Sequence, residues 1–179
     1  MVIANLWLAL PIALIPLLVG FVYYGPMGFH AAWQREAGLS DEEVQGGNMV
    51  KIFGLSLLYS FLVACWVPLF TIHQTALSGM FGTSAMEQWM VAGSDLMQRL
   101  DAVHEVSGLY TNHLHFGHGA LHGFLVALFF VGPIFWINGL FERKSWKYML
   151  IHTGYWVICL VLMGGVWAQF ATLNLPMSQ

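Results

Sequence analysis

Charged side chains are scarce in this sequence. Asp, Glu, Lys and Arg make up 8% of its 179 residues, whereas apolar residues make up 58%. A soluble domain carries about 25% charged residues, so the composition excludes an ordinary water-soluble protein and predicts a membrane protein. The six basic residues form no patch dense enough for nucleic acid, so we expect no nucleic-acid partner.

Cysteine is scarce as well. Cys65 and Cys159 both lie inside apolar runs, where a thiol behaves as a small apolar group. They exclude a disulfide framework and a CxxC metal site. The N-terminus also lacks the basic segment of a cleaved signal peptide, so we interpret its apolar run as a retained helix.

Long apolar runs, by contrast, are abundant. A spanning segment needs about 20 apolar residues, and it must be helical because hydrocarbon offers the backbone no hydrogen-bond partner. Four runs meet this criterion, at about residues 2–24, 52–72, 116–140 and 148–172. They predict an all-α integral membrane protein with a single domain, residues 1–179, and four transmembrane helices in two hairpins. Kinks are expected at the prolines, which are Pro11, Pro16, Pro68 and Pro133.

The basic residues are unequally divided between the two sides of such a bundle. The first and third connections hold Arg35, Lys51, Arg143, Lys144 and Lys147, and the other side holds Arg99 alone. By the positive-inside rule, both termini and the long connection 73–115 face outward. The interpretation is a multi-pass protein of the bacterial cytoplasmic (inner) membrane, with the lipid bilayer as its surroundings.

Short helices are expected in two of the connections. Ser40 and Glu43 have the spacing of a capping box, and Ser84 and Glu87 repeat it in the long outer connection. Apolar residues follow the second pair at roughly helical period, namely Met86, Trp89, Met90, Met97, Leu100 and Val103. This pattern predicts a short amphipathic helix on the outer membrane surface or over the bundle.

Two stretches carry a resemblance to a known family. They are GFVYYGPMGFHAAWQREAGLSDEE, after the first span, and HGALHGFLVALFFVGPIFWINGLFERKSWKYMLIHTGYW, across the third span and into the fourth. The chain resembles a bacterial family of small four-helix membrane proteins, domain of unknown function 1761. The resemblance implies a fold and a membrane location. It implies no catalytic residue, and it does not account for His113, His115 and the long outer connection.

Five of the eight histidines lie between His104 and Gly123, at the entry of the third span. If that helix begins near Asn112 as its N-cap, His115, His118 and His122 share one face, and the last two have the i, i+4 spacing of a helical chelate. His73, at the outer end of the second span, lies at a similar depth. We predict a transition-metal site of His73, His115, His118 and His122. Possible further contributors are His104, Glu105 and His113.

The metal is left open, because imidazole suits zinc, copper or iron. A b-type haem between His73 and either His118 or His122 is a less favoured cofactor. The histidine boxes of membrane di-iron desaturases fit poorly, because only His118 and His122 match HxxxH. The plain alternative is that these rings hydrogen-bond to water, headgroups and loop carbonyls at the membrane interface.

Other polar groups are weaker candidates. An inner set comprises His30, Asn138, Glu142, Arg143 and His152. Structural packing and a solvated turn explain these residues better than a site does. The methionines at 80, 86, 90, 97 and 177 could bind copper(I), although methionine at helical spacing is more often apolar surface.

Three classes of function remain open, and no reaction is assigned. The first is a metal-binding or redox membrane protein. The second is a non-catalytic accessory subunit that packs against a larger membrane complex or against itself, as thirteen Phe and eight Trp residues allow. The third, a transporter or proton relay, is least favoured because no acidic residue lies inside a predicted span.

Overall fold

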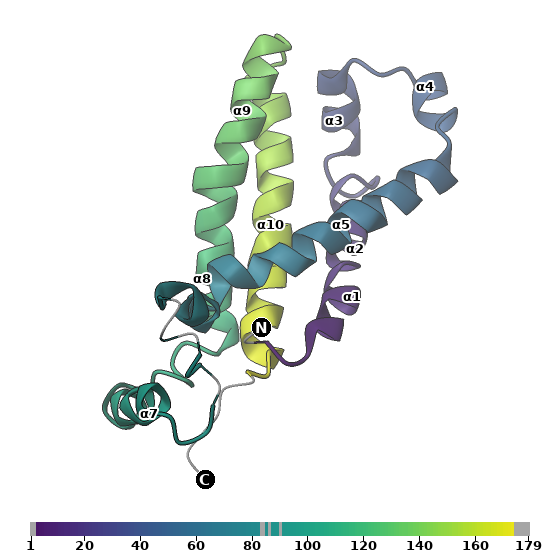
Figure 1. The fold of residues 1–179 in the computed structure, drawn as a ribbon. Coiled ribbons are helices and arrows are strands. Elements are labelled where there is room, and N and C mark those ends of the chain that lie inside the picture. The colour runs from purple at the N-terminus through teal and green to yellow at the C-terminus, as the bar shows by residue number, and fades with distance from the viewer. Residues whose placement is uncertain (1–2, 83–84, 86, 90, 174–179) are drawn as a thin grey trace.

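The computed structural model describes residues 3–82, 85, 87–89 and 91–173. Its helices include four that are long and apolar enough to cross a membrane. These helices run Leu6–Tyr23, Met49–Thr71, Phe116–Phe141 and Trp146–Phe170. Each lies close to a run predicted from the sequence, and the all-α fold with four spans is confirmed (Figure 1).

Proline accompanies breaks in the first and third spans, as expected, whereas the second span continues as one helix through Pro68. In the first span, η1 (Leu6–Leu8) and α1 (Ala9–Ile12) are separated from α2 (Ile15–Tyr23) by a short turn. Pro16 lies at the start of α2, where its missing N–H is harmless. In the third span, α8 (Phe116–Val126) passes through the π-helical turn η3 (Ala127–Val131) into α9 (Gly132–Phe141), which begins with the Gly132–Pro133 pair. The fourth span, α10 (Trp146–Phe170), is continuous.

Helices α8 and α10 form the tightest pair in the fold. Glycine brings their backbones together, because a Cβ at Gly119 would meet the Gly164 carbonyl, and one at Gly123 would meet that of Leu160. Small residues at a helix interface allow such close approach inside a membrane, where lipid competes equally for apolar side chains. The second hairpin is therefore a rigid support for the side chains on α8.

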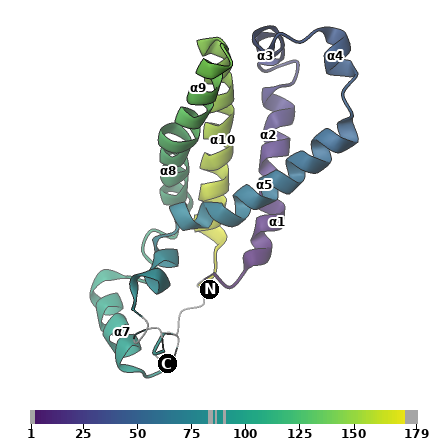
Figure 2. The same cartoon turned by 45° about the horizontal axis from the view of Figure 1, so that its top comes forward.

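Helix α5 (Met49–Thr71) runs obliquely across the other spans instead of alongside them (Figures 1 and 2). Its N-terminus is capped by the Asn48 side chain, which accepts the Lys51 N–H. Near its other end, the buried Trp167 indole of α10 donates a 2.9 Å hydrogen bond to the Ala64 carbonyl. This bond fixes the C-terminal half of α5 against α10.

Both ends of the described chain meet at one end of the bundle, which we call the termini end. The Ala4 N–H donates to the Thr172 carbonyl at 2.8 Å, and Asn5 bonds the backbone of Phe170 and Thr172. On the same bundle, the Tyr155 hydroxyl of α10 donates to the Pro16 carbonyl at 2.9 Å. The first span is thus tied to the fourth.

The connections carry shorter helices. At the far end lie α3 (His30–Ala37) and α4 (Asp41–Gln45), and Ser40 and Glu43 form the predicted capping box. At the termini end lie the 3-10 helix η2 (His73–Met80) and the amphipathic helix α7 (Asp95–Ser107). Ser84, the expected cap, lies outside the described residues. Helix α7 is capped instead by Ser94, ten residues later, whose hydroxyl accepts the Met97 N–H.

Candidate metal centre

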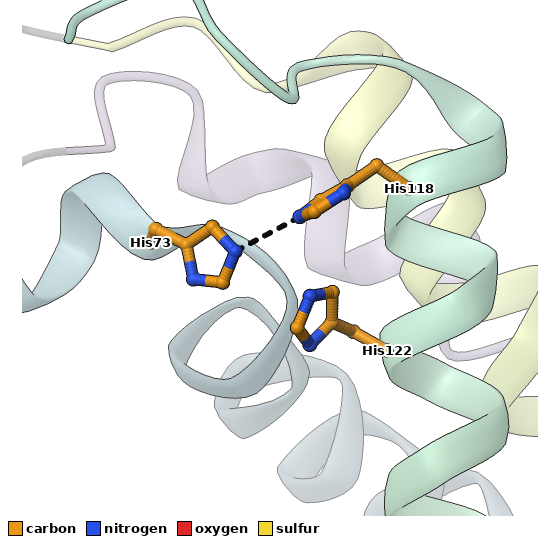
Figure 3. A group of neighbouring side chains, drawn as sticks. All are labelled: His73, His118 and His122. Atoms are coloured by element: carbon orange, nitrogen blue, oxygen red, sulfur yellow. Dashed lines mark hydrogen bonds between the residues drawn. The ribbon is translucent and has the colours of Figure 1, made fainter.

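Three histidines converge at the termini end of the bundle. Each of His73, His118 and His122 offers one ring nitrogen, and these three nitrogens lie within 4.8 Å of one another (Figure 3). The Nε2 atoms of His73 and His118 are 2.9 Å apart, at hydrogen-bond distance, so that one ring donates to the other. We call these three residues the histidine triad.

The local backbone explains this convergence. The chain leaves α5 at Ile72 in an extended conformation, which places His73 at the start of η2. On α8, His118 and His122 are one turn apart and face it, with ring centroids 4.5 Å from each other. The His73 ring centroid is 5.0 Å from that of His118 and 4.7 Å from that of His122.

The fourth histidine predicted for the site has a different position. Helix α8 begins at Phe116 with His115 as its N-cap, so the expectation of an N-cap at Asn112 is wrong. The His115 Nδ1 accepts the His118 N–H at 3.3 Å, in the role that a Ser or Asp side chain usually plays. Its ring centroid lies 5.9 Å from that of His118, outside the triad.

His113 lies against the triad but is not among the residues whose ring nitrogens converge there. Its ring stacks on His118 at a centroid distance of 4.4 Å and an interplanar angle of 24°, and it meets the edge of His73 at 5.8 Å. A stacked ring presents its face, while its nitrogens point to the sides. The backbone of His113 has a φ of 67°, an uncommon conformation for a residue other than glycine.

The remaining predicted contributors, His104 and Glu105, lie on helix α7, away from the triad. The Nδ1 of His104 accepts the Tyr110 N–H at 3.2 Å, and its ring stacks on Tyr110 at 4.6 Å. Burial and the bond from its hydroxyl to Asp101 raise the pKa of Tyr110 to about 12. Glu105 is exposed on α7. These residues shape the long connection and do not reach the triad.

A residue that sequence reasoning missed supports the site. Gln74 follows His73 directly, is 4% exposed, and donates from its amide nitrogen to the Leu109 and Asn112 carbonyls at 3.1 and 2.9 Å. It therefore anchors the loop that carries His113. The sequence showed only that a polar residue follows the predicted ligand His73. It did not indicate which groups the Gln74 side chain would bond.

The inner candidates form a separate aromatic group. The Tyr24 hydroxyl bonds the His152 Nδ1 at 3.0 Å, and the His30 Nδ1 lies 3.2 Å from the Tyr24 carbonyl. Burial raises the pKa of Tyr24 above its ordinary range. Asn138 is exposed in the last turn of α9, and Glu142 is exposed at the turn between α9 and α10, where Arg143 has a φ of 56°. Hydrogen bonds and ring packing hold Tyr24, His30 and His152 together, while the buried Nε2 of His152 has no partner among the described residues.

Of the five methionines considered as copper(I) ligands, Met80 and Met97 lie among the described residues. Met97, on α7, is buried, and Met80 is 75% exposed. Met86, Met90 and Met177 lie outside the described residues. The imidazoles are thus the donors that the described structure brings together.

Fold and cluster together define a class, that of a small all-α protein with four potential membrane spans and a three-histidine cluster at one end. The model of the family Protein of unknown function (DUF1761) matches residues 8–168, and the chain belongs to that family. The resemblance seen in the sequence is confirmed. No curated protein and no solved structure matches the chain.

Proposed function

We propose that the histidine triad binds one transition-metal ion at the outer face of a membrane. The observation that carries this proposal is the meeting of three imidazole nitrogens within 4.8 Å. Zinc is bound by imidazole at about 2.0–2.1 Å, so the ligand nitrogens of one ion lie about 3–4 Å apart. A small closure of His122 toward the other two rings would complete the site.

The donor set favours a borderline metal ion with an open position. Imidazole ligands suit zinc, copper and iron, and three protein nitrogens leave a fourth position for water or another ligand. Haem fits less well, because its plane must lie between two opposed nitrogens. The Nε2 atoms of His73 and His118 are 2.9 Å apart, which suits neighbouring ligands of one ion.

Metal analysis of the purified full-length protein tests the proposal. We expect about one zinc, copper or iron ion per chain, with loss of at least tenfold in affinity for His118→Ala and for His122→Ala. His30→Ala is the matched control, because His30 lies at the other end of the bundle and bonds a carbonyl. A protein without stoichiometric metal, or equal metal content in all variants, would leave only a hydrogen-bonded histidine pair.

The second candidate is a non-catalytic subunit of a membrane assembly. The observation that favours it is the exposure of α5, on which Val50, Phe53 and Tyr59 are 86, 56 and 60% exposed. Lipid also covers such residues, so exposure alone does not distinguish the two. Co-purification with one fixed partner after mild solubilisation would favour this function, and a stable isolated monomer would count against it.

A further inference from the structure

The proposed ion has one ligand position that the histidine triad does not fill (Figure 3). Structural zinc is almost always held by four protein ligands, whereas catalytic zinc keeps one position for water or substrate. A further side chain of this chain that reaches the fourth position would therefore decide which kind of site the triad belongs to.

His113 lies closer to the triad than His115 does. Its ring centroid is 4.4 Å from that of His118 and 5.8 Å from that of His73, whereas the His115 centroid is 5.9 Å from that of His118. Two imidazoles on one tetrahedral zinc ion have centroids about 5 Å apart, since each nitrogen lies about 2 Å from the ion and each centroid about 1 Å beyond it. Within the triad the separations are 4.5, 4.7 and 5.0 Å. His113 is thus about as far from His73 and His118 as a fourth ligand would be.

The ring of His113 is also free to turn. His113 is exposed, and its ring nitrogens make no hydrogen bond to the residues that the structure describes. By contrast, the Nδ1 of His115 caps α8, and the Nδ1 of His104 accepts a backbone N–H. Exposed side chains change rotamer within nanoseconds, so the stack on His118 is no lasting obstacle. A turn of the His113 ring about its side-chain bonds would aim a nitrogen at the ion.

The backbone at His113 is held in place from the side of the triad. Gln74, which is buried and follows His73 directly, donates to the Asn112 carbonyl at 2.9 Å, in the peptide unit that leads into His113. His113 itself has a φ of 67°. Uncommon conformations of this kind persist where the surrounding structure fixes them, and they cluster at ligand-binding sites. One buried side chain thus keeps His73 and His113 side by side, as the outer shell of a metal site does for its ligands.

We propose that His113 is the fourth ligand of the ion, which is then enclosed by four imidazoles. The inference rests on the proposed function for the ion itself. His73 begins the outer connection 73–115 and His113 lies near its end, so the bound ion also joins the two ends of this connection. A site closed in this way stabilises the fold and offers no position to a substrate.

The first test is the zinc affinity of the full-length protein, measured without a histidine tag. His113→Gly removes the imidazole, and glycine readily adopts the positive φ of this position, so the loop keeps its course. We expect zinc to bind at least tenfold more weakly, and free imidazole to restore most of the loss. His115→Asn is the matched control, because it removes a neighbouring ring and keeps a good N-cap for α8. It should bind zinc as the wild type does.

The second test asks whether the fourth position is open. Cobalt(II) replaces zinc, and azide is added as a small ligand that binds at an unfilled position and changes the visible absorption of the metal. The wild type should bind no azide, because His113 fills the position. His113→Gly should bind it.

The outcomes separate this inference from the proposed function. Unchanged zinc affinity in His113→Gly, a loss that imidazole does not restore, an equal loss in His115→Asn, or azide binding to wild-type cobalt would each overturn the fourth ligand and leave the triad's ion in place. A wild type that binds neither zinc nor cobalt would refute the proposed function, and the fourth ligand with it.

Discussion

At the scale of single residues, Gln74 matters most for the arrangement around the triad. Its amide nitrogen holds two carbonyls of the loop that carries His113, and its side chain is almost fully buried. Its Oε1 is also buried and has no partner among the described residues. Gln74 therefore orders this loop, but it leaves one buried oxygen atom without a hydrogen-bond donor.

Replacing this residue should destabilise the protein. In Gln74→Leu, the Leu109 and Asn112 carbonyls lose their donor, and we expect a loss of about 1–3 kcal/mol in unfolding free energy. Thermal unfolding in detergent measures the change. Gln98→Leu is the control, because Gln98 also donates to a carbonyl, that of Gly93, but is exposed. Its expected effect is below about 0.5 kcal/mol. Equal losses in both variants would contradict the anchoring role.

The chemistry of single residues predicted part of the histidine site from the sequence, but not all of it. The i, i+4 spacing of His118 and His122 and the depth of His73 were sufficient to place these three rings together as candidates. The sequence could not distinguish Asn112 from His115 as the N-cap. Asn112 is the commoner cap, but its side chain instead bonds the Ser107 carbonyl in the preceding turn.

At the scale of elements, the contact between α8 and α10 determines where the triad's two helical members lie. It depends on glycines that face each other across the pair, so their positions tolerate no Cβ. The sequence showed that Gly164 and its neighbour were small, but not that Gly119 and Gly123 of another helix would meet them. Long-range pairing of this kind leaves no signal in local periodicity.

The glycine contact can be tested with one added methyl group. Gly119→Ala should lower stability by about 1–3 kcal/mol, because the new Cβ meets the Gly164 carbonyl and overpacks the interface. Gly54→Ala provides the control in α5, where a Cβ would meet nothing within 4 Å. There, removing a helical glycine should stabilise by about 0.5–1 kcal/mol. If both variants were stabilised, or both destabilised, this explanation of the interface would be ruled out.

The contact between α3 and the start of α10 should depend on pH. The Ser145 hydroxyl donates to the Glu36 carboxylate at 2.6 Å, and this bond, with a smaller effect of Arg35, lowers the pKa of Glu36. Because the folded-state pKa is depressed, the contact contributes fully above the ordinary glutamate value of about 4.3. Its contribution is lost as the pH falls through the lowered pKa.

Tryptophan fluorescence can follow this transition through Trp33 in α3. We expect an acid-induced change in the wild type that begins below the ordinary glutamate pKa of about 4.3 and is complete only below the lowered pKa of Glu36. Glu36→Gln should remove its pH dependence, whereas Glu42→Gln, on the exposed surface of α4, should leave it unchanged. A transition of the same size in Glu36→Gln would show that another group is responsible.

At the scale of the whole molecule, the proposed membrane orientation has a direct test. The termini end holds the triad, and the far end holds five of the six basic residues. By the positive-inside rule, alkaline phosphatase fused after Gln179 should be active in the periplasm. The same enzyme inserted between Gly46 and Gly47 should be inactive. The opposite pattern would place the triad on the cytoplasmic side.

The sequence could not predict that α5 runs obliquely to the other spans. This inclination has a consequence for the surrounding bilayer. A 23-residue helix is about 35 Å long when upright, enough for a hydrocarbon core of about 30 Å. With the α8–α10 hairpin upright in the bilayer, we infer that the inclined α5 covers a shorter depth and that its flanking Asn48 and Lys51 lie deeper than the headgroups. We therefore expect the surrounding lipid to thin on that side. The protein should therefore concentrate in membranes of short-chain lipids, and thick bilayers should destabilise it.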